Sequence, residues 1–383
     1  MCASRGFSNL DIFKIGGRNM IPILFGAGET AFTTEGRGRL ADGESCLVTW
    51  ERNEVYELEL IYPPGGVLAE ELNMGRQILA VPFYGAAPEI FDIYRTEMDA
   101  MGRLTANAWH KSYRLNGQVC GPYTAGNARD AMTGIYAPAG AEALTFTFAW
   151  DGDTVPTGKL EVTKPLPVRA LLGGSEGSIL DVYGGTLWWE GNTVTLMQDP
   201  GEDRGVRVTW GKNLQELSHQ TDIENTYTRV LCYYYKEDTG ATWGSAAVTG
   251  TEGWTAPRRR TLVLDVTADM DKAAKDQGVE PTVTPEALTA WAEDYVDAHL
   301  HELRDVQVAT ELRFLDLSVT GEIPGGGGLE QLRPMDVVTL THPRLTEPVK
   351  TRAVRTVWDV YRERYEEITI GTLQKRLDSY LTR

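Results

Sequence analysis

Short runs in which apolar and polar residues alternate recur along most of the chain and predict β-strands. The clearest run covers residues 55–62, VYELELIY, where every second residue from Tyr56 to Tyr62 is apolar and two glutamates lie on the other face. Gly and Pro residues follow it, as expected of a turn. The other predicted strands cover residues 76–83, 90–97, 104–109, 144–150, 226–235, 261–266, 308–319, 335–341, 349–358 and 365–370.

Residues 168–198 contain the densest succession of predicted elements. The apolar run at 168–172, VRALL, predicts a strand, and a pair of glycines ends it. Ser175 then caps a short helix over residues 176–183, and a second pair of glycines ends that helix. The hairpin that follows has its strands at 186–190 and 193–198 and turns at Gly191-Asn192.

One long helix is predicted over residues 285–303. Thr284 is its N-cap, and Pro285 occupies the first position, where its missing N–H costs nothing. Apolar residues at helical spacing form one face, which we expect to pack on a C-terminal barrel; they include Leu288, Trp291, Tyr295 and Leu303. Shorter helices are predicted at 128–136 and 373–381, a flexible loop at 240–253 and a polar linker at 269–281.

Composition favours a β-rich protein of several compact units. The chain has 383 residues, and its 40 glycines, 10 tryptophans and 16 tyrosines are typical of a sheet protein with many turns. We predict a mainly β fold with a few helices (α+β). Its domains are a barrel or sandwich at 20–115, a middle α+β domain at 116–222 and a third domain at 223–383. Residues 1–19 lack the apolar core of a signal peptide and are predicted to be a poorly packed leader.

Charge and cysteine content exclude several classes of function. The net charge of −17 argues against a nucleic-acid-binding surface, because phosphate attraction requires clustered Lys and Arg. The four cysteines are far apart and form no C-x-x-C pair, so neither a zinc site nor a disulfide framework is predicted. No run of about 18 apolar residues is present, so no membrane span is predicted.

A candidate hydrolase motif lies in the central segment. Residues 173–177 read Gly-Gly-Ser-Glu-Gly and match G-x-S-x-G, the strand–turn–helix elbow that would make Ser175 a nucleophile. The chain offers few of the strand–helix units that an α/β-hydrolase needs. The alternative is that the glycines form a tight turn and Ser175 caps the helix. The histidines after the serine are His219, His299, His301 and His342.

The other polar motifs do not form a convincing site, and we predict no catalytic, cofactor-binding or metal-binding residues. His299 and His301 are two apart on a helix and point about 200° from each other. The four glycines at 325–328 lack the Lys-Ser/Thr of a P-loop. The arginines at 258–260 favour a partner surface. Many Asp and Glu residues leave a carboxylate pair for glycoside hydrolysis open, although none stands out.

Four segments resemble one family of phage tail proteins. Residues 170–196, ALLGGSEGSILDVYGGTLWWEGNTVTL, are similar to a characteristic segment of the prophage endopeptidase tail family, also described as the tail-associated lysozyme N-terminal region. Residues 211–214 with 225–230 and residues 361–371 agree with other parts of that family. Residues 332–338, LRPMDVV, resemble its L-R-P-G-D-x-V strand entry, with Met335 in place of the usual glycine.

The resemblance implies a baseplate or tail-tip hub without catalysis. It implies tail-tube-like barrels in 20–115 and 223–383, a homotrimer that caps the tube, and the distal tail and tape-measure proteins as partners. Location would be the virion tail tip after synthesis in the bacterial cytoplasm, and no lytic C-terminal domain is expected. Genomic DNA would pass an acidic channel without specific binding. A serine hydrolase using Ser175 and a carbohydrate-binding tail module, suggested by the many Trp and Tyr residues, are the alternatives.

Overall fold

A computed structural model describes residues 21–371 except 176, 199, 210–213, 223–225, 239, 251–259, 305–306, 315–330 and 342–348. The predicted leader at 1–19, the glycine run at 325–328 and the closing helix at 373–381 lie outside the described residues. These form two compact units, one from the segments up to Ser218 and from Thr310 onward, the other from His219–Ala309. The fold is mainly β with a few helices, which confirms the predicted fold class.

The larger unit is built on one 13-stranded sheet, as far as the structure describes it. Its strand order is β16-β20-β23-β22-β3-β4-β7-β6-β5-β1-β2, with β21 also paired to β22 and β15 paired to β21. The described sheets do not close on themselves, and the two-barrel arrangement stays a prediction. The strands are β1 Ile23–Phe25, β2 Gly38–Arg39, β3 Ser45–Glu51, β4 Tyr56–Tyr62, β5 Gln77–Ala80, β6 Glu89–Met98, β7 Leu104–His110, β15 Val206–Thr209, β16 Leu214–Asp222, β20 Gln307–Phe314, β21 Val337–Thr341, β22 Val349–Asp359 and β23 Arg364–Gly371.

The alternation of apolar and polar residues along each strand determines which side chains of this sheet lie in the core. In β4, Tyr56, Leu58, Leu60 and Tyr62 are buried, as predicted, while the residues between them are more exposed. β4 lies antiparallel between β3 and β7, where Leu58 is opposite Val48 on one side and a fully buried alanine on the other. Small side chains on β7 leave room for the larger ones on β4.

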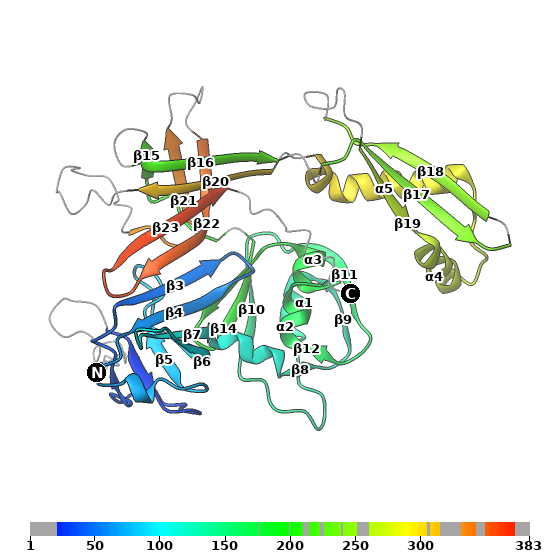
Figure 1. The fold of residues 1–383 in the computed structure, drawn as a ribbon. Helices are drawn as coiled ribbons and strands as arrows, with labels where there is room; N and C mark the ends of the chain where they lie inside the picture. The colour runs from blue at the N-terminus through cyan, green and yellow to red at the C-terminus, as the bar shows by residue number, and fades with distance from the viewer. Residues whose placement is uncertain are drawn as a thin grey trace, which may run out of the picture. The chain divides into compact units, whose positions relative to one another are not determined.

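Strands from the N-terminal and C-terminal parts of the described chain are neighbours in this sheet. β22 pairs antiparallel with β3, where Trp358 is opposite Val48, and with β23 on its other side (Figure 1). Trp358 and Tyr365 therefore belong to the same apolar core as Val48 and Leu58. Strands from the N-terminal and C-terminal parts of the sequence are thus joined by both backbone hydrogen bonds and apolar burial.

The middle segment of the larger unit has a second apolar core, to which its three short helices contribute residues. Figure 1 shows these helices. The predicted helix at 128–136 begins as expected but ends earlier, at Thr133, where the Gly134 N–H bonds back to the Asp130 carbonyl. The elements near this core are β8 Val119–Cys120, β9 Tyr123–Asn127, α1 Ala128–Thr133, β10 Thr147–Asp151, β11 Thr157–Val162, β12 Leu166–Pro167, α2 Val168–Leu172, α3 Ile179–Tyr183, β13 Thr186–Glu190 and β14 Thr193–Met197. Two 3-10 helices, η2 Ala69–Glu71 and η3 Lys111–Asn116, precede it.

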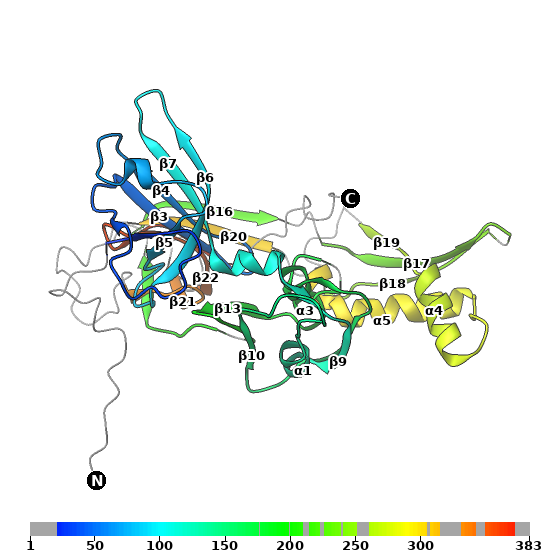
Figure 2. The same ribbon diagram turned by 90° about the horizontal axis from the view of Figure 1, so that it is seen from below.

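The smaller unit is a three-stranded sheet with helices (Figure 2). Its order is β18-β17-β19, and its elements are β17 Arg229–Lys236, β18 Gly240–Ala247, β19 Thr261–Asp265, α4 Thr267–Gln277 and α5 Pro285–Arg304. The prediction of a loop at 240–253 is wrong over residues 240–247, which form β18. Most of its residues are small, so its sequence shows no clear alternation of apolar and polar residues. The predicted linker at 269–281 is also wrong as far as Gln277, because these residues belong to α4, which buries Met270 and Ala274, four residues apart.

The long helix α5 begins as predicted, since the Thr284 hydroxyl accepts a hydrogen bond from the Ala287 N–H at 3.2 Å. Leu288 and Leu303 are buried on the predicted face, whereas Trp291 and Tyr295 are only partly buried. The face packs on β18 and β17 of a three-stranded sheet that is open in the described residues, so the predicted packing against a barrel is wrong. In the described part of the chain, no helix combines the length and apolarity that crossing a membrane requires.

Gly244→Ala tests the close approach of α5 to β18. A Cβ at Gly244 would lie 2.6 Å from the Leu288 carbonyl carbon and closer still to the Thr289 nitrogen. The helix must move away, and we expect the free energy of unfolding in urea to fall by about 1–3 kcal/mol or more. Gly126→Ala is the matched control, because no atom lies within 4 Å of its added carbon. Equal stability of the two variants would contradict this packing.

Candidate functional site

The central segment begins with a helix, so the predicted strand at 168–172 is wrong. Val168, Leu171 and Leu172 are buried at i, i+3 and i+4, which is helical spacing within a run too short to show its period. Ser178, and not Ser175, caps the next helix α3, since its hydroxyl accepts a bond from the Asp181 N–H at 3.3 Å. The hairpin β13–β14 turning at Gly191-Asn192 is confirmed.

Ser175 lies between two helices, so the strand–turn–helix context of a nucleophile elbow is absent. Its exposed hydroxyl donates to the Ala170 carbonyl at 3.1 Å. His110 bonds to Glu89 and Ser112, and the His299 ring contacts the Tyr295 carbonyl. The side chains of His219, His301 and His342 lie outside the described part of the structure, as does most of the arginine run 258–260.

The hairpin inserts two tryptophans between the two apolar cores. Trp188 contacts Trp50 of β3 and Phe83 of the turn between β5 and β6, with ring centroids 6.0 and 5.8 Å away. Trp189 contacts Phe146 of the middle segment at 6.0 Å and packs against both cores. Successive residues of a strand point to opposite faces, so the two rings hold different surfaces. We call Trp188 and Trp189, together with the rings they contact, the tryptophan junction.

One end of β13 is held by the turn between β3 and β4. The Asn53 amide donates to the Gly185 carbonyl at 3.0 Å, and its oxygen accepts from the Leu187 N–H at 2.9 Å. Arg52 donates to the fully buried Thr186 hydroxyl at 3.0 Å. Asn53 has a φ of 61°, a left-handed conformation that asparagine tolerates better than most residues.

The other end of β13 is held by Glu89, which is 3% exposed. Its carboxylate accepts from the Gly191 N–H at 2.7 Å and contacts Lys111 Nζ at 3.0 Å and His110 Nε2 at 3.4 Å. Burial alone raises the pKa of Glu89, but these three partners outweigh it, so the pKa lies below its ordinary value. The buried carboxylate is therefore ionised and compensated, as a buried charge must be.

Arg169 of α2 fixes the helix beside the junction. Its guanidinium donates to the Ser112 hydroxyl at 3.2 Å and to the Glu54 carbonyl at 3.4 Å, and lies 4.0 Å from the Tyr113 ring centroid. Burial lowers the pKa of Arg169. These contacts have a structural role, because the guanidinium N–H groups donate to a hydroxyl and a backbone carbonyl of the same unit.

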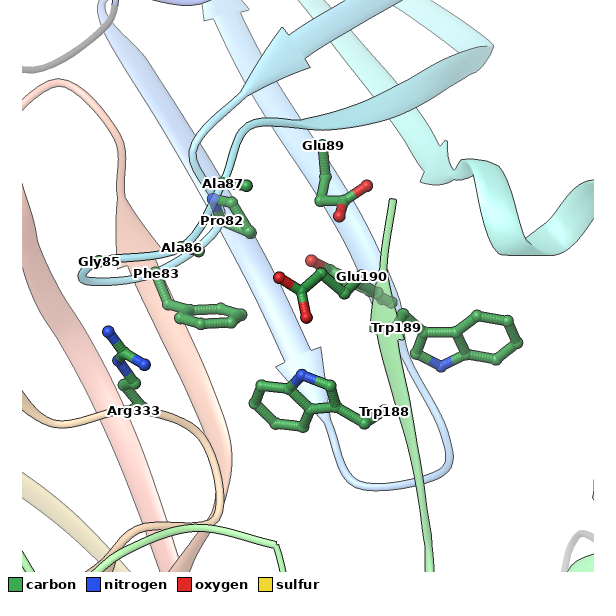
Figure 3. A pocket seen from close by; sticks show the side chains of 11 residues that line it. Pro82, Phe83, Gly85, Ala86, Ala87, Glu89, Trp188, Trp189, Glu190 and Arg333 are labelled. Carbon is green, nitrogen blue, oxygen red and sulfur yellow. The ribbon is translucent and has the colours of Figure 1, made fainter. Parts of the chain in front are cut away.

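Two cavities flank the tryptophan junction. One of about 230 Å³ lies beside Tyr113, Arg169 and Trp189. The other, of about 100 Å³, is lined by Phe83, Trp188, Glu190 and Arg333 among others; Figure 3 shows these side chains around a common space. Such volumes suit waters or one side chain. Within the described residues, no group of three or more His, Cys, Asp or Glu side chains is placed to hold a metal ion.

The L-R-P-M-D turn reaches this junction through Arg333. Asp336, 1% exposed, accepts from the Glu202 N–H at 2.8 Å, the Arg204 Nε at 2.8 Å and the Arg333 N–H at 2.9 Å. Met335 keeps the left-handed conformation that the family's glycine would favour, with a φ of 69°, and its side chain is buried. The turn therefore holds a methionine in a conformation that glycine adopts more easily.

Comparisons with known proteins show what this architecture resembles. No protein-family model matches the sequence, and a search of curated proteins finds no match. Among solved structures, prophage tail protein gp18 from Listeria monocytogenes EGD-e matches with a TM-score of 0.52 and 13% identity, covering 94% of this chain and 96% of that one. The prophage MuSo2 43 kDa tail protein from Shewanella oneidensis matches with a TM-score of 0.53 and 11% identity, covering 94% and 99%.

The chain has the fold of prophage tail proteins. A tail protein from Neisseria meningitidis MC58 agrees, with a TM-score of 0.51, 9% identity and coverage of 92% of this chain and 96% of that one. The predicted resemblance to a prophage tail family is thereby confirmed at the level of fold.

Sequence reasoning missed the residues that anchor the junction. Asn53 lies just before the predicted strand at 55–62, and an asparagine there is a turn signal, but the strand before it, β3, was not predicted. Glu89 and His110 carry no such signal, because each is a single polar residue at the end of a predicted strand. Their pairing depends on the register of β6 and β7, which the sequence does not show.

Paired variants of Met335 test the strain at its turn. Both Met335→Ala and Met335→Gly lose the buried side chain, at a cost of about 2–5 kcal/mol. Glycine also removes the left-handed penalty of about 1–2 kcal/mol, so we expect the glycine variant to be the more stable one. Urea unfolding measures both. An alanine variant at least as stable as the glycine variant would contradict the strained turn.

Proposed function

We propose that this chain is a structural protein of a phage or prophage tail, acting as a tail-tip or baseplate hub. The observation that carries the proposal is the fold shared with three tail proteins over at least 92% of this chain. The finer features come from the family resemblance: a homotrimer, two tube-like barrels per copy at 20–115 and 223–383, and therefore six barrels that cap a six-fold tube. The distal tail and tape-measure proteins are the proposed partners, in the virion.

The described site supports a role in assembly rather than catalysis. The buried polar groups of the tryptophan junction are engaged in holding segments together, as Asn53 and Glu89 illustrate. Ser175 is bonded to a backbone carbonyl and lacks the elbow context. In this proposal the protein works through shape and symmetry, and the net charge of −17 lets DNA pass an acidic lining without being bound.

Electron microscopy of intact tails tests the proposed trimer. We expect three copies of this chain at the tail tip, related by a three-fold axis that coincides with the tube axis. Intact tails are the sample because the isolated chain lacks the tube that templates the ring. Two or six copies would contradict the trimer, and absence of the chain from purified tails would contradict the structural role itself.

Carbohydrate binding is a second candidate, favoured by exposed rings in the smaller unit. Trp243 is 60% exposed and Tyr235 is 50% exposed, and Trp243 points away from α5 because its neighbour Gly244 faces the helix. We expect Trp243→Ala to lower binding of cell-surface glycans on an array at least about tenfold by removing a stacking surface. Val263→Ala, at an exposed aliphatic residue, is the control. An array without hits for the unchanged protein would contradict this role.

A further inference from the structure

His110 is fully buried where the large sheet meets the tryptophan junction. Its ring stacks on Tyr56 at 4.0 Å and faces Trp189 at 6.3 Å. Nδ1 accepts a hydrogen bond from the Ser112 N–H at 3.3 Å, which caps the 3-10 helix η3. A neutral imidazole with an accepting Nδ1 carries its proton on Nε2, so Nε2 donates to Glu89.

A second proton on this ring would break the cap. It would sit on Nδ1 and oppose the Ser112 N–H, donor against donor. The charged groups around the ring are Glu89 on β6, Lys111 on η3 and Arg169 on α2, and the Tyr56 phenol on β4 stacks on it. Glu89 favours the imidazolium, but burial and the two cations outweigh it, so the pKa of His110 is lowered.

We propose that His110 is a pH-sensitive latch that holds the β13–β14 hairpin against the large sheet at neutral pH and releases it in mild acid. The mechanical link is short, because Glu89 contacts both His110 and the Gly191 N–H at the hairpin turn. Movement of Trp189 uncovers the imidazolium. The adjacent cavity of about 230 Å³ is lined by Tyr56 and Trp189, the two rings that contact His110, so water in it lies behind those rings.

The direction of the pH response and the pH range in which it occurs follow from the titration of His110. A histidine whose pKa is lower in the closed state favours closure while it is neutral, so closure weakens as the pH falls below the ordinary value of 6.5. If the closed state stays neutral, the opening equilibrium constant rises up to about 30-fold between about pH 7.5 and about pH 5.0. Glu89 acts in the same direction, but its ordinary value is 4.5, so its contribution comes at lower pH.

Hydrogen exchange of the full-length protein tests the latch. Rates for peptides covering β13–β14 and η3 are measured between about pH 7.5 and pH 5.0 and corrected for the intrinsic pH dependence of exchange. We expect their opening to increase at least tenfold, while a peptide from β4 changes little. Hairpin and η3 rates that stay constant after correction would overturn the proposal, and that result would leave the proposed tail role untouched.

Two variants assign the response to His110. The side-chain amide introduced by His110→Asn retains an oxygen that accepts from the Ser112 N–H but does not titrate, so we expect the response to disappear. Glu190→Gln, the comparison variant, replaces an exposed carboxylate of the same hairpin and leaves His110 and Glu89 in place, so it should keep a response in the same window. A His110→Asn protein with the unchanged response would overturn the proposal. If that variant does not fold, an NMR titration of His110 that shows no protonation-linked opening above pH 5 would do so.

Discussion

The strand that carries Trp188 and Trp189 joins two apolar cores, and the architecture of the larger unit depends on its register. Burial of the two indoles is favourable but has no direction of its own. A slip of one residue would turn each ring to the opposite face of the strand. The anchors at the two ends of the strand, Asn53 and Glu89, remove that freedom because each bonds to a specific backbone group.

Two unfavourable backbone conformations and one buried charge lie where distant segments meet. Asn53 and Met335 both have positive φ, and both lie in turns that contact another part of the chain. Glu89 is a buried carboxylate at such a contact, and its partners offset the loss of hydration. Strain and buried charge of this kind persist only when the surrounding structure fixes them.

The sequence predicts those parts of the fold in which local signals agree with packing. β4 alternates cleanly, the β13–β14 hairpin has a Gly-Asn turn, and α5 has both a cap and an apolar face. Prediction fails where the pattern is weak: α2 is too short to show a helical period, and β18 alternates between small residues. Among its described side chains, α4 buries only Met270 and Ala274. The contacts of the tryptophan junction could not be predicted for another reason. Glu89, His110 and Gly191 are far apart in the sequence, and only the pairing register of the strands brings them together.

The pairing of β22 with β3 affects how the chain folds during synthesis. Val48 leaves the ribosome roughly 300 residues before its partner Trp358. At about 5–20 residues per second, the outer edge of β3 lacks its native neighbour for roughly 15–60 s. An unpaired strand edge is a template for wrong pairing with other chains. Completion of the sheet is therefore a late, non-local step, and the nascent chain has to remain soluble until its C-terminal strands arrive.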